Sequence, residues 1–154
     1  MNIFLLDEDK TLCAQAHLDK HVVKMITEYA QLLSTTVRLS GINEGYRVTH
    51  QNHPCAKWCR ASLSNWLYLR DLTSELQTEY NYRYGKVHKS FVVAANLPLP
   101  RISDSGLTPF ALAMPDEYKT QDAVQSYRNY YNGAKRHIAT WKNRERPVWY
   151  ENKP

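Results

Sequence analysis

The sequence predicts an all-α fold, a compact single domain of about three main helices. Apolar residues recur every three or four positions over long stretches, and Gly and Pro gather between those stretches. A length of 154 residues suits one domain around one core. No internal repeat or linker divides the chain, so we expect a single helical domain over residues 1–154, ending in a basic aromatic tail (142–154).

Residues 9–39 are expected to form a short turn and then a long helix that starts near Asp19, a suitable N-cap. One side of this stretch is an apolar stripe at helical spacing: Val22, Ile26, Tyr29, Leu33 and Val37. A second stripe is polar: His17, His21, Lys24, Glu28, Gln31 and Thr35. The first long helix therefore has a chemical face beside its packing face.

A second helix is expected from about Cys55 to Tyr84, with Pro54 in its first turn and Gly85 at its end. Its apolar stripe is Trp58, Trp66, Leu69, Leu72, Leu76 and Tyr80. Residues 86–119 carry four prolines and predict a folded loop crossing the core, with a short helix or strand at 91–95. A third helix is expected over 120–141, buried through Ala123, Val124, Tyr127, Tyr131, Ala134 and Ile138.

Composition and the N-terminus favour a soluble cytoplasmic protein without a membrane anchor. Hydrophobic residues make up 43% and charged residues 23%, as in globular proteins. The start, MNIFLLDEDK, has a short apolar run followed by acids, unlike a signal peptide. No window approaches the roughly 18 apolar residues that a membrane span needs. The three cysteines cannot all pair within the chain, which favours reduced thiols.

The net charge of +5 is concentrated near the C-terminus. Residues 127–149 oppose one acid, Glu145, with six bases: Arg128, Lys135, Arg136, Lys142, Arg144 and Arg146. Aromatic rings alternate with them: Tyr127, Tyr130, Tyr131, Trp141, Trp149 and Tyr150. Cations beside flat rings suit phosphates and unstacked bases, which predicts a nucleic-acid partner. The alternative is a solvated helix face whose rings point into the core.

The polar stripe of the first long helix is the first candidate catalytic site. Glu28 lies one turn beyond Lys24 and two turns beyond His21, so these three side chains can converge on one cleft. A carboxylate there can act as a general acid or base, and a desolvated Lys can become a nucleophile. The alternative is an ordinary Lys24–Glu28 surface pair worth a few tenths of a kcal/mol.

The loop before the second helix is a candidate phosphate contact. Asn52, His53 and Pro54 stand at a helix start, whose free N–H groups attract anions, and Lys57 and Arg60 follow one turn later. The alternative is that Asn52 and His53 only cap the helix.

Metal ligation is an alternative for the cysteines and histidines. Cys13, His17 and His21 are spaced by four residues, and the next segment supplies more potential zinc ligands: His50, His53, Cys55 and Cys59. This spacing matches no closed zinc pattern, so we expect no metal and no cofactor, with the cysteines packed as small hydrophobes. The acidic run 7–9 could bind a divalent ion or, more commonly, start a helix.

Several of these features occur in an order that resembles the phage and bacterial pyrimidine-dimer DNA glycosylases of the endonuclease V type. A very short N-terminal segment precedes a helix with His21 and, seven residues later, Glu28. Next come Gly45-Tyr46, Asn52-His53-Pro54, Arg83-Tyr84-Gly85 and the closing Arg146-Pro147-Val148-Trp149-Tyr150. The resemblance covers most of the chain and implies a compact helical domain whose N-terminus points into the active cleft.

The resemblance also implies a mechanism and a partner, DNA, in duplex form and damaged or modified. The terminal α-amine, of Met1 or of Asn2 after Met removal, would attack the sugar C1′ to form an imine, with assistance from Glu28. His21 and Lys24 would line the cleft. Residues expected to contact nucleic acid are Asn52, His53, Lys57, Arg60, Arg128, Lys135, Arg136, Arg146, Trp149 and Tyr150. Thr27 and Gln31 depart from the family, which carries phosphate-binding arginines there.

Two other functions fit the same residues. One is a nucleotide- or base-modifying enzyme on the same scaffold, which would use His21, Lys24 and Glu28 without the terminal amine. The other is a non-catalytic nucleic-acid-binding protein, which needs only the basic aromatic tail.

Overall fold

The computed structural model describes residues 1–151, and all regular secondary structure within them is helical. The predicted all-α class is confirmed, with six α-helices and two short 3₁₀ turns over the described residues. The helices are α1 (Lys10–Ala16), α2 (Asp19–Leu39), α3 (Pro54–Ala61), α4 (Leu63–Tyr84), α5 (Lys89–Ala95) and α6 (Ala123–Ala134). The end of the predicted basic tail, residues 152–154, lies outside this range. No helix within it is long and apolar enough to cross a bilayer.

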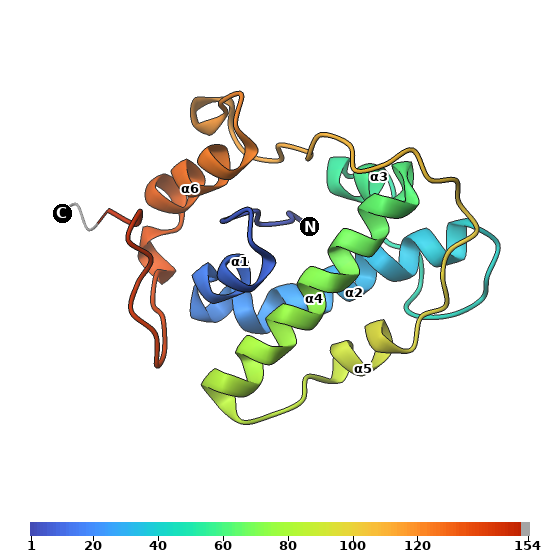
Figure 1. Cartoon of the computed structure of the whole chain (residues 1–154), viewed down its shortest axis with the longest axis horizontal. Helices are drawn as coiled ribbons and strands as arrows, with labels where there is room; N and C mark the ends of the chain where they lie inside the picture. The colour runs from blue at the N-terminus through green and yellow to red at the C-terminus, as the bar shows by residue number, and fades with distance from the viewer. Residues whose placement is uncertain (152–154) are drawn as a thin grey trace.

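Helices α2 and α4 cross at the centre of the molecule, and the N-terminal segment lies beside them (Figure 1). All five members of the predicted apolar stripe of α2 are fully buried. Trp66 of α4 is also buried and donates its indole N–H to the carbonyl of Leu33 at 3.2 Å. Helices α3 and α5 pack on both long helices, while α1 packs on α4. The two long helices thus form the frame that carries the polar face of α2.

The predicted second helix is interrupted at Ser62, which adopts an extended backbone (φ −158°, ψ 145°). Residues 103–105, in the segment between α5 and α6, supply hydrogen-bond partners at this break. Ser62 donates its hydroxyl to Asp104 at 2.9 Å, and the amide of Leu63 donates to the carbonyl of Ser103 at 3.0 Å. Two helices, α3 and α4, therefore replace the single one expected. Gly85 ends α4 in the left-handed conformation at φ 67°, as its position predicts.

Helix α6 is shorter than predicted, because it starts after the N-cap Asp122 and ends at Ala134. Tyr127 and Tyr131 are fully buried, whereas the other predicted core positions of this segment are only half-buried. Residues 91–95 are helical within α5, and the segment from α5 to α6 runs around the outside of the frame (Figure 1). After Ala134 the chain continues as a short 3₁₀ turn, Arg136–Ile138, in place of the predicted last turns of the helix.

Asp19 does not cap α2 with its side chain as the sequence suggests, because Leu18 holds the cap position. The carboxylate instead accepts from the Lys142 amide at 2.8 Å, the Thr140 hydroxyl at 2.8 Å and the Arg83 guanidinium at 3.0 Å. These contacts fasten the C-terminal segment to the start of α2.

A buried ion network extends this attachment. Arg83, fully buried, pairs with Glu79 at 2.7 Å and also with Asp19. Arg144 reaches the other oxygen of Glu79 at 2.9 Å, so one carboxylate that is 3% exposed holds two guanidinium groups. Removal of one partner from such a buried network is strongly destabilising, because it leaves a buried charge uncompensated. Arg83 also donates to the Gln15 carbonyl of α1 at 2.9 Å, so the network joins α1, α2, α4 and the C-terminal segment.

Replacing Glu79 with Gln is expected to lower the free energy of unfolding by about 3 kcal/mol, because it leaves Arg83 buried without its carboxylate. The matched control is Asp71→Asn, whose partners Lys10 and Arg70 are partly solvated and whose loss should cost about 1 kcal/mol or less. Urea unfolding of the two variants measures both quantities. Equal losses would show that the buried network adds nothing beyond a surface pair.

Candidate active site at the N-terminal amine

Residues 1–6, called here the N-terminal arm, run as an extended segment into the centre of the fold (Figure 1). Ile3, Phe4, Leu5 and Leu6 are each at most 3% exposed. The apolar run at the start of the sequence is therefore core, packed among α1, α2 and α6. Its burial directs the terminal amine toward the polar face of α2.

The α-amino nitrogen of Met1 lies 2.9 Å from Oε1 of Glu28, and the side chains of these residues are 5% and 14% exposed. The second carboxylate oxygen, Oε2, is buried without a hydrogen-bond partner among the described residues. Lys24 Nζ approaches Oε2 to 3.7 Å, but its side chain is 72% exposed. Glu28 thus contacts two amines, one held inside the fold and one in solvent. A carboxylate in this position can take a proton from the ammonium and leave a neutral, nucleophilic amine.

His53 lies close enough to the terminal amine and Glu28 for their charges to affect its pKa. Partial burial lowers its pKa, the charges of the amine and His50 lower it further, and Glu28 opposes them. Nδ1 of His53 accepts from the Cys55 amide at 3.0 Å, so His53 caps α3 as the alternative proposed. Asn52 and Lys57 beside it are exposed, while Arg60 is half-buried with Nη1 lacking a partner among residues 1–151. Of the predicted loop, His53 thus lies near enough to the amine to respond to its charge.

His21 lies beneath the arm and is only 5% exposed. Its ring stacks on Phe4 with centroids 4.2 Å apart, and its Nδ1 lies 2.6 Å from the Tyr131 hydroxyl. Burial lowers the pKa of His21 to about 2, with smaller contributions from the charges of His17, Lys135 and Lys24. This histidine remains neutral and supports the arm, while Lys24 reaches Glu28 from the solvent side.

Cys13, His17 and His21 engage different partners and do not surround a common point. Cys13 Sγ accepts from the Leu6 amide at 3.3 Å and donates to the Phe4 carbonyl at 3.2 Å. Within residues 1–151 there is no group of three or more His, Cys, Asp or Glu side chains able to hold a metal ion. Asp9, from the acidic run, caps α1 by accepting from the Leu12 amide.

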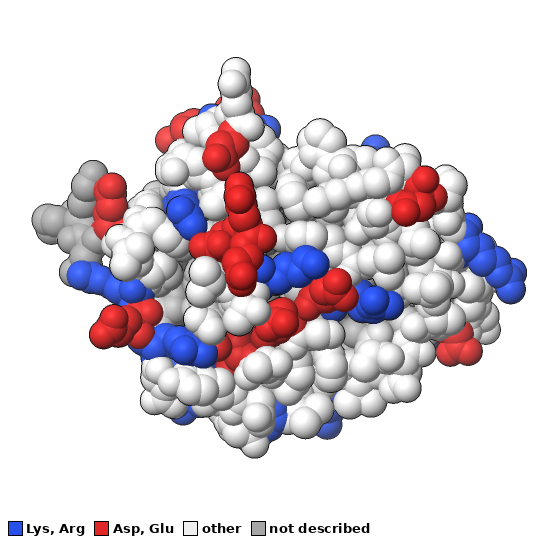
Figure 2. All heavy atoms as spheres, in the orientation of Figure 1, with Lys and Arg blue, Asp and Glu red and all other residues white. Residues whose placement is uncertain are grey.

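Much of the C-terminal positive charge is engaged inside the molecule. Arg128 donates Nε to the Leu6 carbonyl at 2.8 Å, pairs with Asp7 at 3.2 Å and lies over the Trp149 ring. Arg136 donates to the Glu151 carbonyl at 2.8 Å. On the face shown in Figure 2, blue and red side chains adjoin one another rather than forming a separate basic patch. Arg128 therefore anchors the arm.

The remaining predicted contacts divide between packed and exposed groups. Lys135 lies over the Tyr130 ring, and Tyr150 packs edge-on against Trp141. Trp149 is half-buried, whereas Arg146 is exposed. Most rings of the tail are therefore packed, as the alternative predicts, while Arg146 faces solvent.

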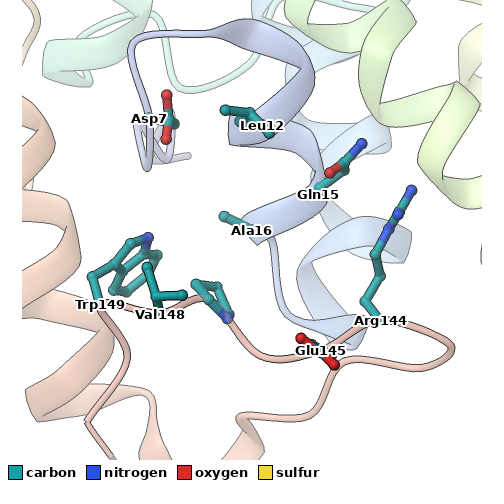
Figure 3. Close-up of a pocket in the computed structure, with 9 residues that line it drawn as sticks. Asp7, Leu12, Gln15, Ala16, Arg144, Glu145, Val148 and Trp149 are labelled. Atoms are coloured by element: carbon teal, nitrogen blue, oxygen red, sulfur yellow. The ribbon is translucent and has the colours of Figure 1, made fainter.

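A hollow of about 240 Å³ separates α1 from the C-terminal segment, as Figure 3 shows. Leu12, Gln15 and Ala16 face it from α1, and Val148 and Trp149 from the opposite side. Met1 and Glu28 are not among its lining residues. The amine site is therefore a separate feature.

One further participant, Tyr29, was not among the predicted site residues. Its place in the apolar stripe predicts core packing, and it is fully buried, but its hydroxyl also accepts from the Phe4 amide at 3.0 Å. A tyrosine among aliphatic residues of a stripe is a weak signal that a polar partner lies nearby.

Comparison with protein-family models, curated proteins and solved structures finds no match.

The buried His17 makes the stability of the fold depend on pH. Burial lowers its pKa from 6.5 to about 4, the charge of Arg83 adds to this, and the bond to the Cys13 carbonyl opposes it. Below pH 6.5 the unfolded chain binds the proton first, so stability falls from there down to about pH 4. The loss attributable to His17 is about 3 kcal/mol.

His17→Gln should therefore lose less stability than the wild type between pH 7 and pH 4.5, as measured by urea unfolding. All other ionisable groups are the same in the two proteins, so the difference between them reports on His17. Parallel losses would contradict a neutral buried His17.

Proposed function

We propose that this protein is a DNA glycosylase with abasic-site lyase activity, whose nucleophile is the terminal α-amine and whose acid/base group is Glu28. The observation that carries the proposal is the 2.9 Å contact between the Met1 nitrogen and Oε1 of Glu28. The resemblance to pyrimidine-dimer glycosylases supports it, because that family uses this pair of groups.

The reaction begins when Glu28 accepts a proton from the ammonium. The neutral amine attacks C1′ of the target nucleotide, so a C1′–N bond to the protein forms as the glycosidic bond breaks and the base leaves with a proton. Opening of the sugar ring gives an imine. Removal of a C2′ proton then breaks the C3′–O bond by β-elimination, and hydrolysis of the imine releases the amine. Glu28 is the group nearest the nitrogen for each proton transfer.

Other groups near the amine suit a nucleic-acid substrate. Lys24, beside Glu28, is exposed and can contact a phosphate next to the reacting sugar. Lys57, one turn after His53 on α3, is also exposed and offers a second cation. Access to the sugar of a duplex nucleotide requires local distortion of the DNA, which such contacts offset. The three free, buried cysteines fit a reducing compartment, and we place the protein in the cytoplasm.

The imine mechanism predicts that borohydride will trap a covalent adduct between the protein and abasic or dimer-containing DNA. Peptide mass spectrometry should locate the adduct at the N-terminal residue, and intact mass identifies that residue as Met1 or Asn2. Glu28→Gln should reduce trapping at least a hundredfold, within the range for general acid–base catalysis. The control, Glu75→Gln on α4, should trap normally. Absence of any adduct in the wild type would overturn the mechanism.

Displacing the amine should abolish most of the activity without weakening DNA binding. One additional Asn before Asn2 moves the nitrogen by up to about 3.3 Å. Because misplacement of a reacting group by an ångström costs about a hundredfold, trapping should fall by at least that factor. Single-turnover trapping at saturating DNA measures the effect, and unchanged trapping would show that the arm does not position the nucleophile.

A non-catalytic DNA-binding protein would bind DNA but form no adduct. Truncation after Thr140 is unsuitable for testing this alternative, because it removes Trp141, which donates to Ala16, and Arg144, which pairs with Glu79. The exposed residues Lys57 and Arg146 offer cleaner alanine variants. Weaker, less salt-dependent binding by these variants, together with no trapping by the wild type, would favour the alternative.

A further inference from the structure

A buried hydrogen-bond chain holds the N-terminal arm at Phe4. The Phe4 amide donates to the Tyr29 hydroxyl at 3.0 Å, and the same hydroxyl lies 2.9 Å from Nε2 of His17. Nδ1 of His17 lies 2.7 Å from the Cys13 carbonyl. Tyr29 and His17 are fully buried, so neither side chain is exposed to bulk solvent.

Only one arrangement of protons satisfies this chain. The Cys13 carbonyl can only accept, so Nδ1 of His17 carries the proton and Nε2 is an acceptor. The Tyr29 hydroxyl must then donate to Nε2, which leaves its oxygen to accept the Phe4 amide. The lowered pKa of His17 is consistent with this neutral form. His17 thus fixes the direction in which Tyr29 presents its acceptor.

Further contacts confine the arm around this point. The thiol of Cys13 bridges the Phe4 carbonyl and the Leu6 amide. The Phe4 ring stacks on His21 and lies within 6.3 Å, centroid to centroid, of Tyr130 and Tyr131. Arg128 binds the Leu6 carbonyl. The arm is therefore fixed from Phe4 to Leu6, and only the residues before Phe4 lie between this clamp and the amine.

Glu28 and Tyr29 are consecutive residues of α2, and they hold the arm at two points, Met1 and Phe4. The intervening extended chain spans roughly 10 Å. We propose that Tyr29, with His17 behind it, is a positioning residue that sets the distance between the terminal amine and the Glu28 carboxylate. Its consequence for catalysis rests on the proposed function, whereas the positioning itself does not.

Core packing alone does not account for a tyrosine at this site. A phenylalanine would fill the same space without the need to satisfy a hydroxyl, and without Tyr29 the Phe4 amide would be a buried, unpaired donor. The polar pair Tyr29 and His17 therefore serves the backbone of the arm, and through it the amine.

Zero-length cross-linking tests the positioning without DNA. A carbodiimide activates the Glu28 carboxylate, an amine attacks the activated carbonyl, and the urea departs as an amide bond forms. Two amines compete for Glu28, the Met1 nitrogen at 2.9 Å and Lys24 Nζ at 3.7 Å. Lys24 lies on the same helix as Glu28, so its distance from the carboxylate does not depend on the arm. The Lys24–Glu28 product therefore serves as an internal reference. Peptide mass spectrometry gives the ratio of the Met1–Glu28 product to the Lys24–Glu28 product.

Tyr29→Phe should lower this ratio at least fivefold, and His17→Gln should lower it less. The matched control is Thr36→Val, which removes another buried hydroxyl from α2 whose bond returns to the Leu32 carbonyl of the same helix. Its ratio should equal that of the wild type. An unchanged ratio in Tyr29→Phe would overturn the proposal; if that variant fails to fold, an unchanged ratio in His17→Gln would do so.

Kinetics on DNA separate positioning from a general loss of structure. Tyr29→Phe should lower kcat for imine formation at least tenfold with KM unchanged, because DNA contacts do not involve the arm. A rise in KM with kcat unchanged would overturn the positioning role. If the cross-link ratio falls in Tyr29→Phe but wild-type protein forms no adduct with DNA, positioning stands and the proposed function fails.

Discussion

The burial of an extended N-terminal arm inside a helical protein is the constraint on which the rest of the structure depends. Among the described residues no strand lies beside the arm, so its backbone groups cannot be paired by a sheet. Side chains supply the partners: Tyr29 and Cys13 at Phe4, Cys13 and Arg128 at Leu6, and Glu28 at the terminal amine. Two members of the polar stripe of α2 serve this segment, Glu28 at the terminal amine and His21 against the Phe4 ring.

Some of the C-terminal positive charge also serves groups inside the molecule. A count along the sequence places a surplus in residues 127–149 and favours a surface role for it. In the fold, Arg128 serves the carbonyl of the arm, and Arg144 shares Glu79 with Arg83. Guanidinium groups suit this task because they remain charged and offer several donors. A local surplus of positive charge can therefore reflect hydrogen bonds and ion pairs inside the molecule as well as affinity for phosphates.

The sequence predicted what local chemistry determines. The α2 stripe, Pro54 at the start of α3 and Gly85 at the end of α4 follow from periodicity and backbone conformation, and the structure confirms them. The break at Ser62 could not be seen, because serine is compatible with a helix and the competing partners lie about 40 residues away, at 103–105. Likewise, Asp19 looks like a cap until the C-terminal segment that claims its carboxylate is in place.

For the candidate site, spacing on the helix was enough to select Glu28 but not Tyr29. Glu28 stands out as a carboxylate on a polar stripe, and the family resemblance gives it a role. Tyr29 falls within the apolar stripe, and its polar partner, the Phe4 amide, is a backbone group that no side-chain pattern can indicate. Functional groups that act through the backbone are therefore the part of a site that sequence reasoning misses most readily.

The two amines at Glu28 show why such backbone anchoring matters. Lys24 lies almost as close to the carboxylate as the terminal nitrogen does, but its long side chain is largely solvated and loses conformational entropy when it is held in one geometry. The terminal amine has no flexible stem, and the entropy cost of placing it was met when the arm folded into the core. Under the proposed function, an amine fixed in this way would meet the sugar carbon in a defined orientation, which lowers the entropic part of the barrier. A buried chain terminus thus offers a precision that a surface lysine beside the same carboxylate does not.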